Sequence, residues 1–422
     1  MMVEMTTPKM KAKQALRALT LCAALAGAAG LLPGTSVQAE EKKTVSKDLA
    51  KPLKAAQEAL QQKKYSDAIA KLKEAEANPK KTPYDQHIIN QLEGYAYANT
   101  KNYPEAAKAF EAELNDGYID PKDVESRVKA LAQINYQLKN YDKAIEYGNR
   151  AIKGGFADEE MQTLVGQSYY LKGDWKGTLK FEDARIDQQI KAGKAPKNEE
   201  LQLALSSCVK LNDNDCQTRE LERLVAYDPK PEYWQNLTSG LRNTHGLSDR
   251  DTLQVYRLMN DVDVIKEPGD YVEMAQLALE QGSPGESQQV LEKGLSKNIF
   301  TDKRIEDKAK RLLESAKHAA ATDQAGLPKA ESEAKAAPTG DKAVAVGLAY
   351  LGYKQYDKAA DMINLGISKG GVKNDAEAHL LLGIAQLKAG HKDDAVKSFH
   401  AVKGNPTLER LANLWSLHAK QV

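Results

Sequence analysis

One block of residues recurs along this chain, and it limits the fold more than any other feature. Each copy has a small residue inside a first helix, a polar turn, and an Ala early in a second helix. Small residues are needed where two antiparallel helices cross closely. Self-similarity at such a period predicts an array of helical pairs. The clearest copies are residues 92–114, 131–152, 346–367 and 381–402, with small residues at Gly94, Ala132, Gly347 and Gly383 and early second-helix residues at Ala106, Ala144, Ala359 and Ala395.

This pattern resembles the tetratricopeptide repeat, which has a small residue and a Tyr on its first helix and an Ala on its second. Weaker copies cover residues 65–80, 165–186, 201–230 and 273–295. We count about eight or nine helical pairs, with anchor Ala residues slightly further apart than the 34 residues of the ideal repeat. The resemblance implies an all-α fold: a right-handed superhelical solenoid of antiparallel helix pairs, ending in a capping helix over residues 407–420.

The array is expected to have one break. Residues 321–339 are rich in Ala, Pro and charge and show no clear apolar stripe, which predicts a flexible or semi-rigid linker. The chain would then consist of an N-terminal array over residues 40–320 and a C-terminal block over residues 340–422. Two repeats and a capping helix form a small core for a block that stands alone, so we consider that the C-terminal block packs back on the main array.

The N-terminus has the organisation of a secretory signal peptide. A basic head precedes an apolar run over residues 18–32, and Val37-Gln38-Ala39 supplies small residues for cleavage after Ala39. The run is shorter than the roughly 20 residues that span a membrane comfortably. We therefore expect residues 1–39 to be removed and the mature chain to be periplasmic or secreted, without a membrane span. The alternative is a retained membrane anchor.

The charge distribution argues against nucleic acid as a partner. Residues 1–39 carry four basic residues and one acidic residue, so their removal changes the net charge from +1 to −2. Nucleic-acid binding requires a basic face, whereas Lys and Glu are interspersed along this chain. Mixed charges of this kind are typical of solvated helix faces.

No complete catalytic motif is present. The sequence has no GxSxG, phosphate loop, HExxH or GxGxxG, and its SxxK matches lack the companion motifs of penicillin-binding enzymes. The seven His residues are scattered, so neither a metal site nor a cofactor site is expected. The sequence predicts a protein that is not an enzyme.

The cysteines allow a more specific prediction. Removal of residues 1–39 leaves only Cys208 and Cys216, an even pair in an oxidising compartment. In the repeat register Cys208 lies late in a first helix and Cys216 at the start of its partner, so the turn brings them together. We predict a disulfide. The alternative, a redox-active pair, usually has CxxC spacing.

Partner binding is expected on the first helices, which line the concave face in repeats of this type. Helical spacing from the small anchors identifies a set of amide and Tyr side chains, called the groove residues below. Amides can satisfy the backbone of an extended peptide, and Tyr rings add apolar contact. Some of these Tyr side chains are instead expected between repeats. The groove residues are Gln91, Tyr95, Asn99, Lys129, Gln133, Tyr136, Gln137, Thr163, Gln167 and Tyr170.

These features together predict a non-catalytic periplasmic scaffold or adaptor that binds protein or peptide partners in the cell envelope. One alternative is a regulatory or glycan-binding accessory subunit of a polysaccharide or peptidoglycan machine. Another is an accessory of a TonB-type energy-transducing complex, with which the resemblance associates exported repeat proteins.

Overall fold

The computed structural model describes residues 43–244 and 246–422, and within these ranges every regular element is an α-helix. The predicted signal peptide, residues 1–39, and its cleavage after Ala39 lie outside the described residues. The chain divides into two compact units, of which unit 1 ends at Asp213 and unit 2 begins at Asn214. In the described ranges, no helix has both the length and the apolar character needed to cross a membrane.

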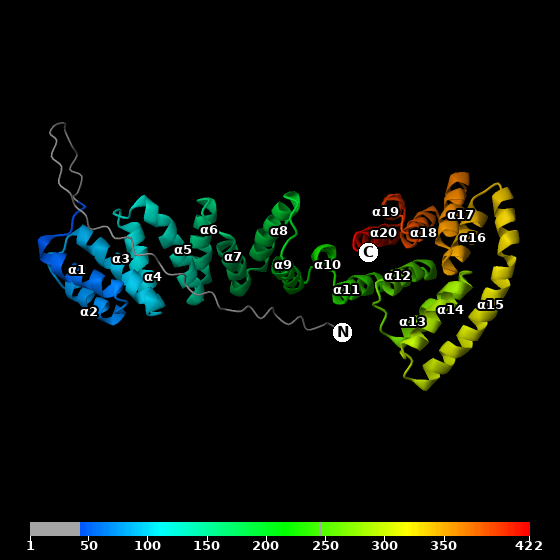
Figure 1. Cartoon of the computed structure of the whole chain (residues 1–422), viewed down its shortest axis with the longest axis horizontal. Coiled ribbons are helices and arrows are strands. Elements are labelled where there is room, and N and C mark those ends of the chain that lie inside the picture. The colour runs from blue at the N-terminus through cyan, green and yellow to red at the C-terminus, as the bar shows by residue number, and fades with distance from the viewer. Residues whose placement is uncertain (1–42, 245) are drawn as a thin grey trace, which may run out of the picture. The chain divides into compact units, whose positions relative to one another are not determined.

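Unit 1 contains nine helices that follow one another in spatial order (Figure 1). Each helix packs against the next one in the chain, and the strongest contacts join α1 with α2, α3 with α4 and α5 with α6. This is the predicted arrangement of helical pairs. The helices are α1 Lys47–Gln61, α2 Tyr65–Glu76, α3 Pro83–Asn99, α4 Tyr103–Asn115, α5 Pro121–Gln137, α6 Tyr141–Lys153, α7 Glu159–Lys172, α8 Trp175–Lys191 and α9 Asn198–Lys210.

The turn inside each helical pair of unit 1 has the same geometry. One residue adopts a left-handed conformation, such as Lys101 with φ of 61° and Gly173 with φ of 84°. The next amide then donates to a carbonyl five residues earlier, as Asn102 N does to Tyr97 O at 2.9 Å. This is a helix C-terminal cap that reverses the chain within a few residues. The repeated polar turn of the sequence is therefore a repeated backbone structure.

The small residues of the repeat lie at helix crossings, as predicted. At Gly94 of α3, an added Cβ would lie 2.3 Å from the Phe110 ring of α4. Gly383 of the last clear copy meets Phe399 in the same way, at 2.4 Å. Ala132 and Ala144, the corresponding pair in α5 and α6, are fully buried. Close packing of paired helices therefore explains the recurring pattern.

Unit 2 begins with five helices and continues through one very long helix. It ends with two helical pairs and a last helix. Within the two units the described residues form eight helical pairs, four in each unit, with α9, α10, α15 and α20 as additional helices. The helices of unit 2 are α10 Asn214–Tyr227, α11 Pro231–Arg242, α12 Asp249–Asp261, α13 Pro268–Glu280, α14 Pro284–Ser296, α15 Lys303–Ala336, α16 Asp341–Gly352, α17 Tyr356–Lys369, α18 Asp375–Lys388, α19 Lys392–His400 and α20 Pro406–Ala419.

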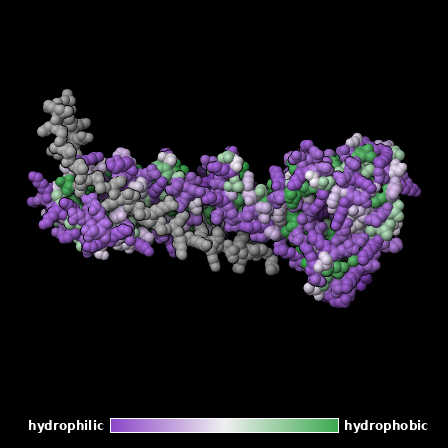
Figure 2. Space-filling model, viewed as in Figure 1, coloured by the Kyte–Doolittle hydropathy of each residue, from purple (hydrophilic) through white to green (hydrophobic). Residues whose placement is uncertain are grey.

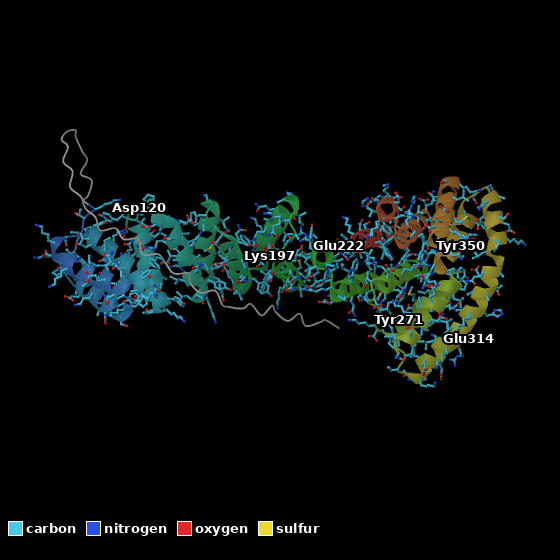
Figure 3. The ribbon with its side chains drawn as sticks, in the orientation of Figure 1. Asp120, Lys197, Glu222, Tyr271, Glu314 and Tyr350 are labelled. Atoms are coloured by element: carbon cyan, nitrogen blue, oxygen red, sulfur yellow. The ribbon has the colours of Figure 1, made fainter. Side chains whose placement is uncertain are left out.

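The predicted linker was wrong for most of its length, because residues 321–336 belong to α15. Buried side chains form one face of this 34-residue helix, and it packs against α13, α14 and α16. Tyr350 of α16, labelled in Figure 3, donates from its hydroxyl to Glu331 Oε2 at 2.5 Å. Ala side chains are enough for an apolar face when neighbouring helices approach closely. The buried face of α15 consists of Ala309, Leu313, Ala316, Ala320, Leu327 and Ala334.

The C-terminal helices pack on the first helices of unit 2. Helix α20 contacts α18 and α19 on one side, as a terminal cap would, and α10 and α12 on the other. Buried polar contacts hold this arrangement: Glu377 of α18 accepts from Arg250 Nη1 at 2.6 Å and from Gln254 Nε2 at 2.8 Å. His418 of α20 lies 2.9 Å from Asp261 of α12. Of the two arrangements considered from the sequence, the C-terminal block therefore packs back on earlier repeats.

Candidate functional site

The groove residues lie on the first helices of unit 1, on α3, α5 and α7. Asn99 and Gln137 are exposed, and Tyr170 is buried at 7% exposure. The remaining groove residues are half-buried: Gln91, Tyr95, Lys129, Gln133, Tyr136, Thr163 and Gln167. On the face in view, Figure 2 shows unit 1 as mainly hydrophilic with small hydrophobic patches. The groove residues that are exposed or half-buried are mostly amides, with two Tyr side chains among them.

Two of the three groove tyrosines connect neighbouring repeats. The Tyr136 hydroxyl donates to Gln167 Oε1 at 2.9 Å, joining α5 to α7, and burial raises the pKa of Tyr136. The Tyr170 hydroxyl lies 2.7 Å from Ser206 Oγ of α9. The structure thus places Tyr170 in the packing between repeats. The most accessible groove residues are Asn99 and Gln137.

Charged groups along the groove are mostly paired within unit 1. Gln91 donates to Oε1 of the fully buried Glu113 at 3.2 Å, while Arg127 Nε donates to its Oε2 at 2.5 Å. Burial lowers the pKa of Lys129, but the neighbouring carboxylates of Glu125 and Asp158 outweigh this effect and raise it overall. Lys129 therefore stays charged and paired at neutral pH.

An acidic pocket of about 410 Å³ lies between α7, α8 and α9, next to groove residues Thr163 and Gln167. Its lining carries five glutamates against one Arg and one Lys. Lys197, labelled in Figure 3, lies just before α9 and pairs with Glu159, which holds the pKa of Glu159 below its ordinary value. The charged lining residues are Glu159, Glu160, Glu182, Arg185, Lys197, Glu199 and Glu200.

A buried ion cluster forms the wall of the acidic pocket on α8. Arg185 donates from Nη1 to Glu182 Oε2 at 3.0 Å and from Nη2 to Glu200 Oε1 at 2.6 Å. Glu182 is fully buried, and its Oε1 has no hydrogen-bond partner among the described residues. Burial raises the pKa of Glu182 to about 7, although the adjacent Arg185 opposes this shift. This carboxyl therefore holds its proton to a higher pH than an ordinary Glu does.

Two glutamates at the pocket mouth are uncompensated. Glu160 and Glu199 are exposed, and neither makes a hydrogen bond or ion pair with another described residue. With Glu159 neutralised by Lys197 and Glu200 by Arg185, the pocket retains an excess of negative charge. Such a cavity favours an ammonium or guanidinium group.

The sequence reasoning did not find the acidic pocket. Its charged residues resemble the solvated Lys and Glu found along every helix of this chain. The one available signal was Gly166, because an added Cβ there would lie within bonding distance of Glu182 Oε1. Gly166 indicates that α7 and α8 cross closely, but it does not indicate which side chain of α8 lies at the crossing.

Other predicted sites can be placed directly. Cys208 of α9 and Cys216 of α10 form a disulfide, as the cysteine spacing predicted. In the part of the chain that the structure describes, no group of three or more His, Cys, Asp or Glu side chains is arranged to hold a metal ion.

Comparison with known proteins supports the same class. A family model described as the RNPP family C-terminal domain matches residues 55–194, which cover most of unit 1. Recurring pairs of packed helices and this match define the chain as a helical-repeat protein. Its fold is a solenoid of the tetratricopeptide-like kind. Repeats of this type generally serve as non-catalytic scaffolds for protein and peptide partners.

The solved structures with similarity are distant. A tetratricopeptide repeat protein from Parabacteroides merdae is 13% identical, with 71% of this chain and 99% of that chain covered and a TM-score of 0.29. The maize pentatricopeptide repeat protein PPR10 is 15% identical, with 85% of this chain and 54% of that chain covered and a TM-score of 0.26. Yeast Tom70 is 10% identical, with 89% of this chain and 96% of that chain covered and a TM-score of 0.24. No curated protein matches the chain. Similarity at this level carries no information about partners.

Proposed function

We propose that this protein is a non-catalytic scaffold of the cell envelope, and that unit 1 binds an extended segment of a partner protein. The observation that carries the proposal is the set of groove amides on α3 and α5, of which Asn99 and Gln137 are exposed, together with Gln167 of α7, which lines the acidic pocket. Amides pair with the backbone of an extended chain, and the pocket accepts a basic side chain or a free amino terminus.

The uncompensated negative charge at the pocket mouth would orient a bound segment along the groove. Glu160 and Glu199 lie on α7 and α9, so a bound segment places its cationic group against these helices and its remaining residues along α5 and α3. Both cations of the pocket lining are already paired with carboxylates, Arg185 with Glu182 and Glu200 and Lys197 with Glu159, which disfavours an acidic segment.

Site-specific crosslinking in cells tests the location of the groove. A photoreactive residue at Gln133 or Gln137 should trap a partner. The same residue at the exposed second-helix positions Lys108 and Lys180 should not. Capture at the second-helix positions alone would reject the groove.

A charge variant tests the role of the acidic pocket. Glu160→Gln with Glu199→Gln should abolish capture from Gln133, whereas Glu105→Gln with Glu146→Gln makes the same change in net charge on second helices and should leave capture intact. Saturable binding of peptidoglycan fragments with no protein capture would support the glycan-binding alternative instead.

Export is tested separately. The proposal requires the mature protein from a periplasmic fraction to begin at Glu40, which N-terminal sequencing determines directly. A full-length chain that remains with the membrane would support the retained anchor, and a full-length chain in the cytoplasm would reject a role in the envelope.

A further inference from the structure

A second cavity, of about 480 Å³, lies inside unit 2 and is independent of the peptide groove. Residues from six helices line it: α12, α14, α16, α17, α18 and α20. It exists only because the C-terminal helices pack on α12. The cavity combines an apolar wall, which includes Val290, Leu351 and Ile384, with an excess of hydrogen-bond donors.

Two of these donors are buried and have no partner. Trp415 of α20 is 1% exposed, and its indole Nε1 makes no hydrogen bond with any described residue. Arg257 of α12 is 6% exposed and donates from Nε and Nη2 to Glu286 at 2.8 and 2.6 Å, but its Nη1 has no partner. Buried donors of this kind are nearly always paired in folded proteins. Both groups line the cavity, and neither can accept a hydrogen bond.

The charges around the cavity favour the same kind of ligand. Four cationic side chains line it against two carboxylates. Glu286 forms an ion pair with Arg257, and Asp261 is paired with Lys388 and His418. Burial alone would raise the pKa of Asp261, but these hydrogen bonds hold it below its ordinary value, so Asp261 stays ionised and occupied. Lys293 pairs with Asp263, which is not part of the lining, so Lys354 is the lining cation that has no carboxylate partner among the described residues.

We propose that unit 2 binds a small organic anion in this cavity, whose oxyanion accepts hydrogen bonds from Trp415 Nε1 and Arg257 Nη1. The apolar wall contacts the carbon body of the ligand, and Lys354 at the turn before α17 supplies additional positive charge. The oxyanion is a carboxylate or a phosphate, since both accept two hydrogen bonds at once. No nucleic acid or membrane is required, because a cavity of about 480 Å³ has the size of a small-molecule site.

Trp415 provides a direct reporter. The chain has three Trp residues, so its ¹H–¹⁵N spectrum contains three indole signals, and a Trp415→Phe variant identifies the one from Trp415. Titration with succinate or with inorganic phosphate should move this signal saturably and leave the Trp175 and Trp234 signals in place. Succinamide, which has the same length and no charge, should move none. Saturation by succinate alone identifies a carboxylate ligand, and saturation by phosphate alone a phosphate ligand.

Affinity measurements on variants test the assignment of residues. Lys354→Gln should weaken binding several-fold, whereas Lys420→Gln, an exposed lysine after α20, should leave it unchanged. Trp415→Phe should weaken it on the order of tenfold by calorimetry. If Trp415→Phe does not fold, Lys354→Gln still decides, because Lys354 is exposed. The proposal is overturned if neither anion moves the Trp415 signal, or if the two lysine variants bind equally.

Discussion

Substitution of Gly383 by Ala tests whether helix crossings fix the small residues of the repeat. Gly383 lies inside α18, where Ala is the better helix former by about 1 kcal/mol. An added Cβ, however, would lie 2.4 and 2.5 Å from two carbons of the Phe399 ring. The ring cannot turn away easily, because Phe399 is 2% exposed and stacks on Trp415 at a centroid distance of 6.1 Å.

The two effects oppose each other, and overpacking is the larger. Extra volume in a closed core costs about 1–3 kcal/mol, and here the rigid ring favours the upper part of that range. We expect Gly383→Ala to lower the free energy of unfolding by about 1–2 kcal/mol. Gly240 of α11 is the matched control, because no atom lies within 4 Å of an added Cβ there. Gly240→Ala should raise stability by about 0.5–1 kcal/mol.

Urea unfolding followed by far-UV circular dichroism measures the change in the free energy of unfolding for both variants, and both substitutions lie in unit 2. A double-mutant cycle with Phe399→Leu identifies the cause: in that background the cost of Gly383→Ala should disappear, with a coupling of about 1–2 kcal/mol. If Gly383→Ala stabilises the protein as much as Gly240→Ala does, close packing does not explain the repeat pattern.

Three other predictions concern unit 1 and the disulfide. Cys208→Ser with Cys216→Ser should lower the free energy of unfolding by about 2–3 kcal/mol, because the closed loop is short, and reductant should do the same to the wild type in a urea titration. Between pH 4.5 and 7 the folded state holds more protons on Glu182 than the unfolded state does, so stability should fall by up to about 3 kcal/mol as pH rises through this window. Glu182→Gln should remove that fall, and melting temperatures from pH 5 to 8 that decline equally in both proteins would contradict the assignment. Tyr136→Phe should cost about 1 kcal/mol in urea unfolding through its lost bond to Gln167, and an unchanged midpoint would show that this bond contributes nothing.

The helical pairs could be predicted from the sequence because the contacts that define them are local. Gly94 and Phe110 belong to consecutive helices, and so do Gly383 and Phe399, so each copy of the repeat contains both partners of its own crossing. The disulfide could be predicted for the same reason, since Cys208 and Cys216 lie on either side of a single turn.

Contacts between distant segments could not be predicted in this way. Arg250 and Glu377 are 127 positions apart, and each has the composition of a solvated helix face when read in its own segment. The error over residues 321–339 has a similar origin. Leu327 and Ala334 form an apolar face only because α16 packs against them, and a segment rich in Ala shows too little contrast between faces to reveal this.

The candidate sites differ in how the side chains that form them are used. In unit 1 the first helices keep accessible amides such as Asn99 and Gln137, and the tyrosines beside them connect adjacent repeats. In unit 2 the last helix is itself packed between earlier helices: Leu411, Leu414 and Trp415 are at most 1% exposed. Surface that is buried within the unit cannot receive a long partner segment, but it can enclose a small ligand. The same repeat therefore favours an extended partner in unit 1 and a small anion in unit 2.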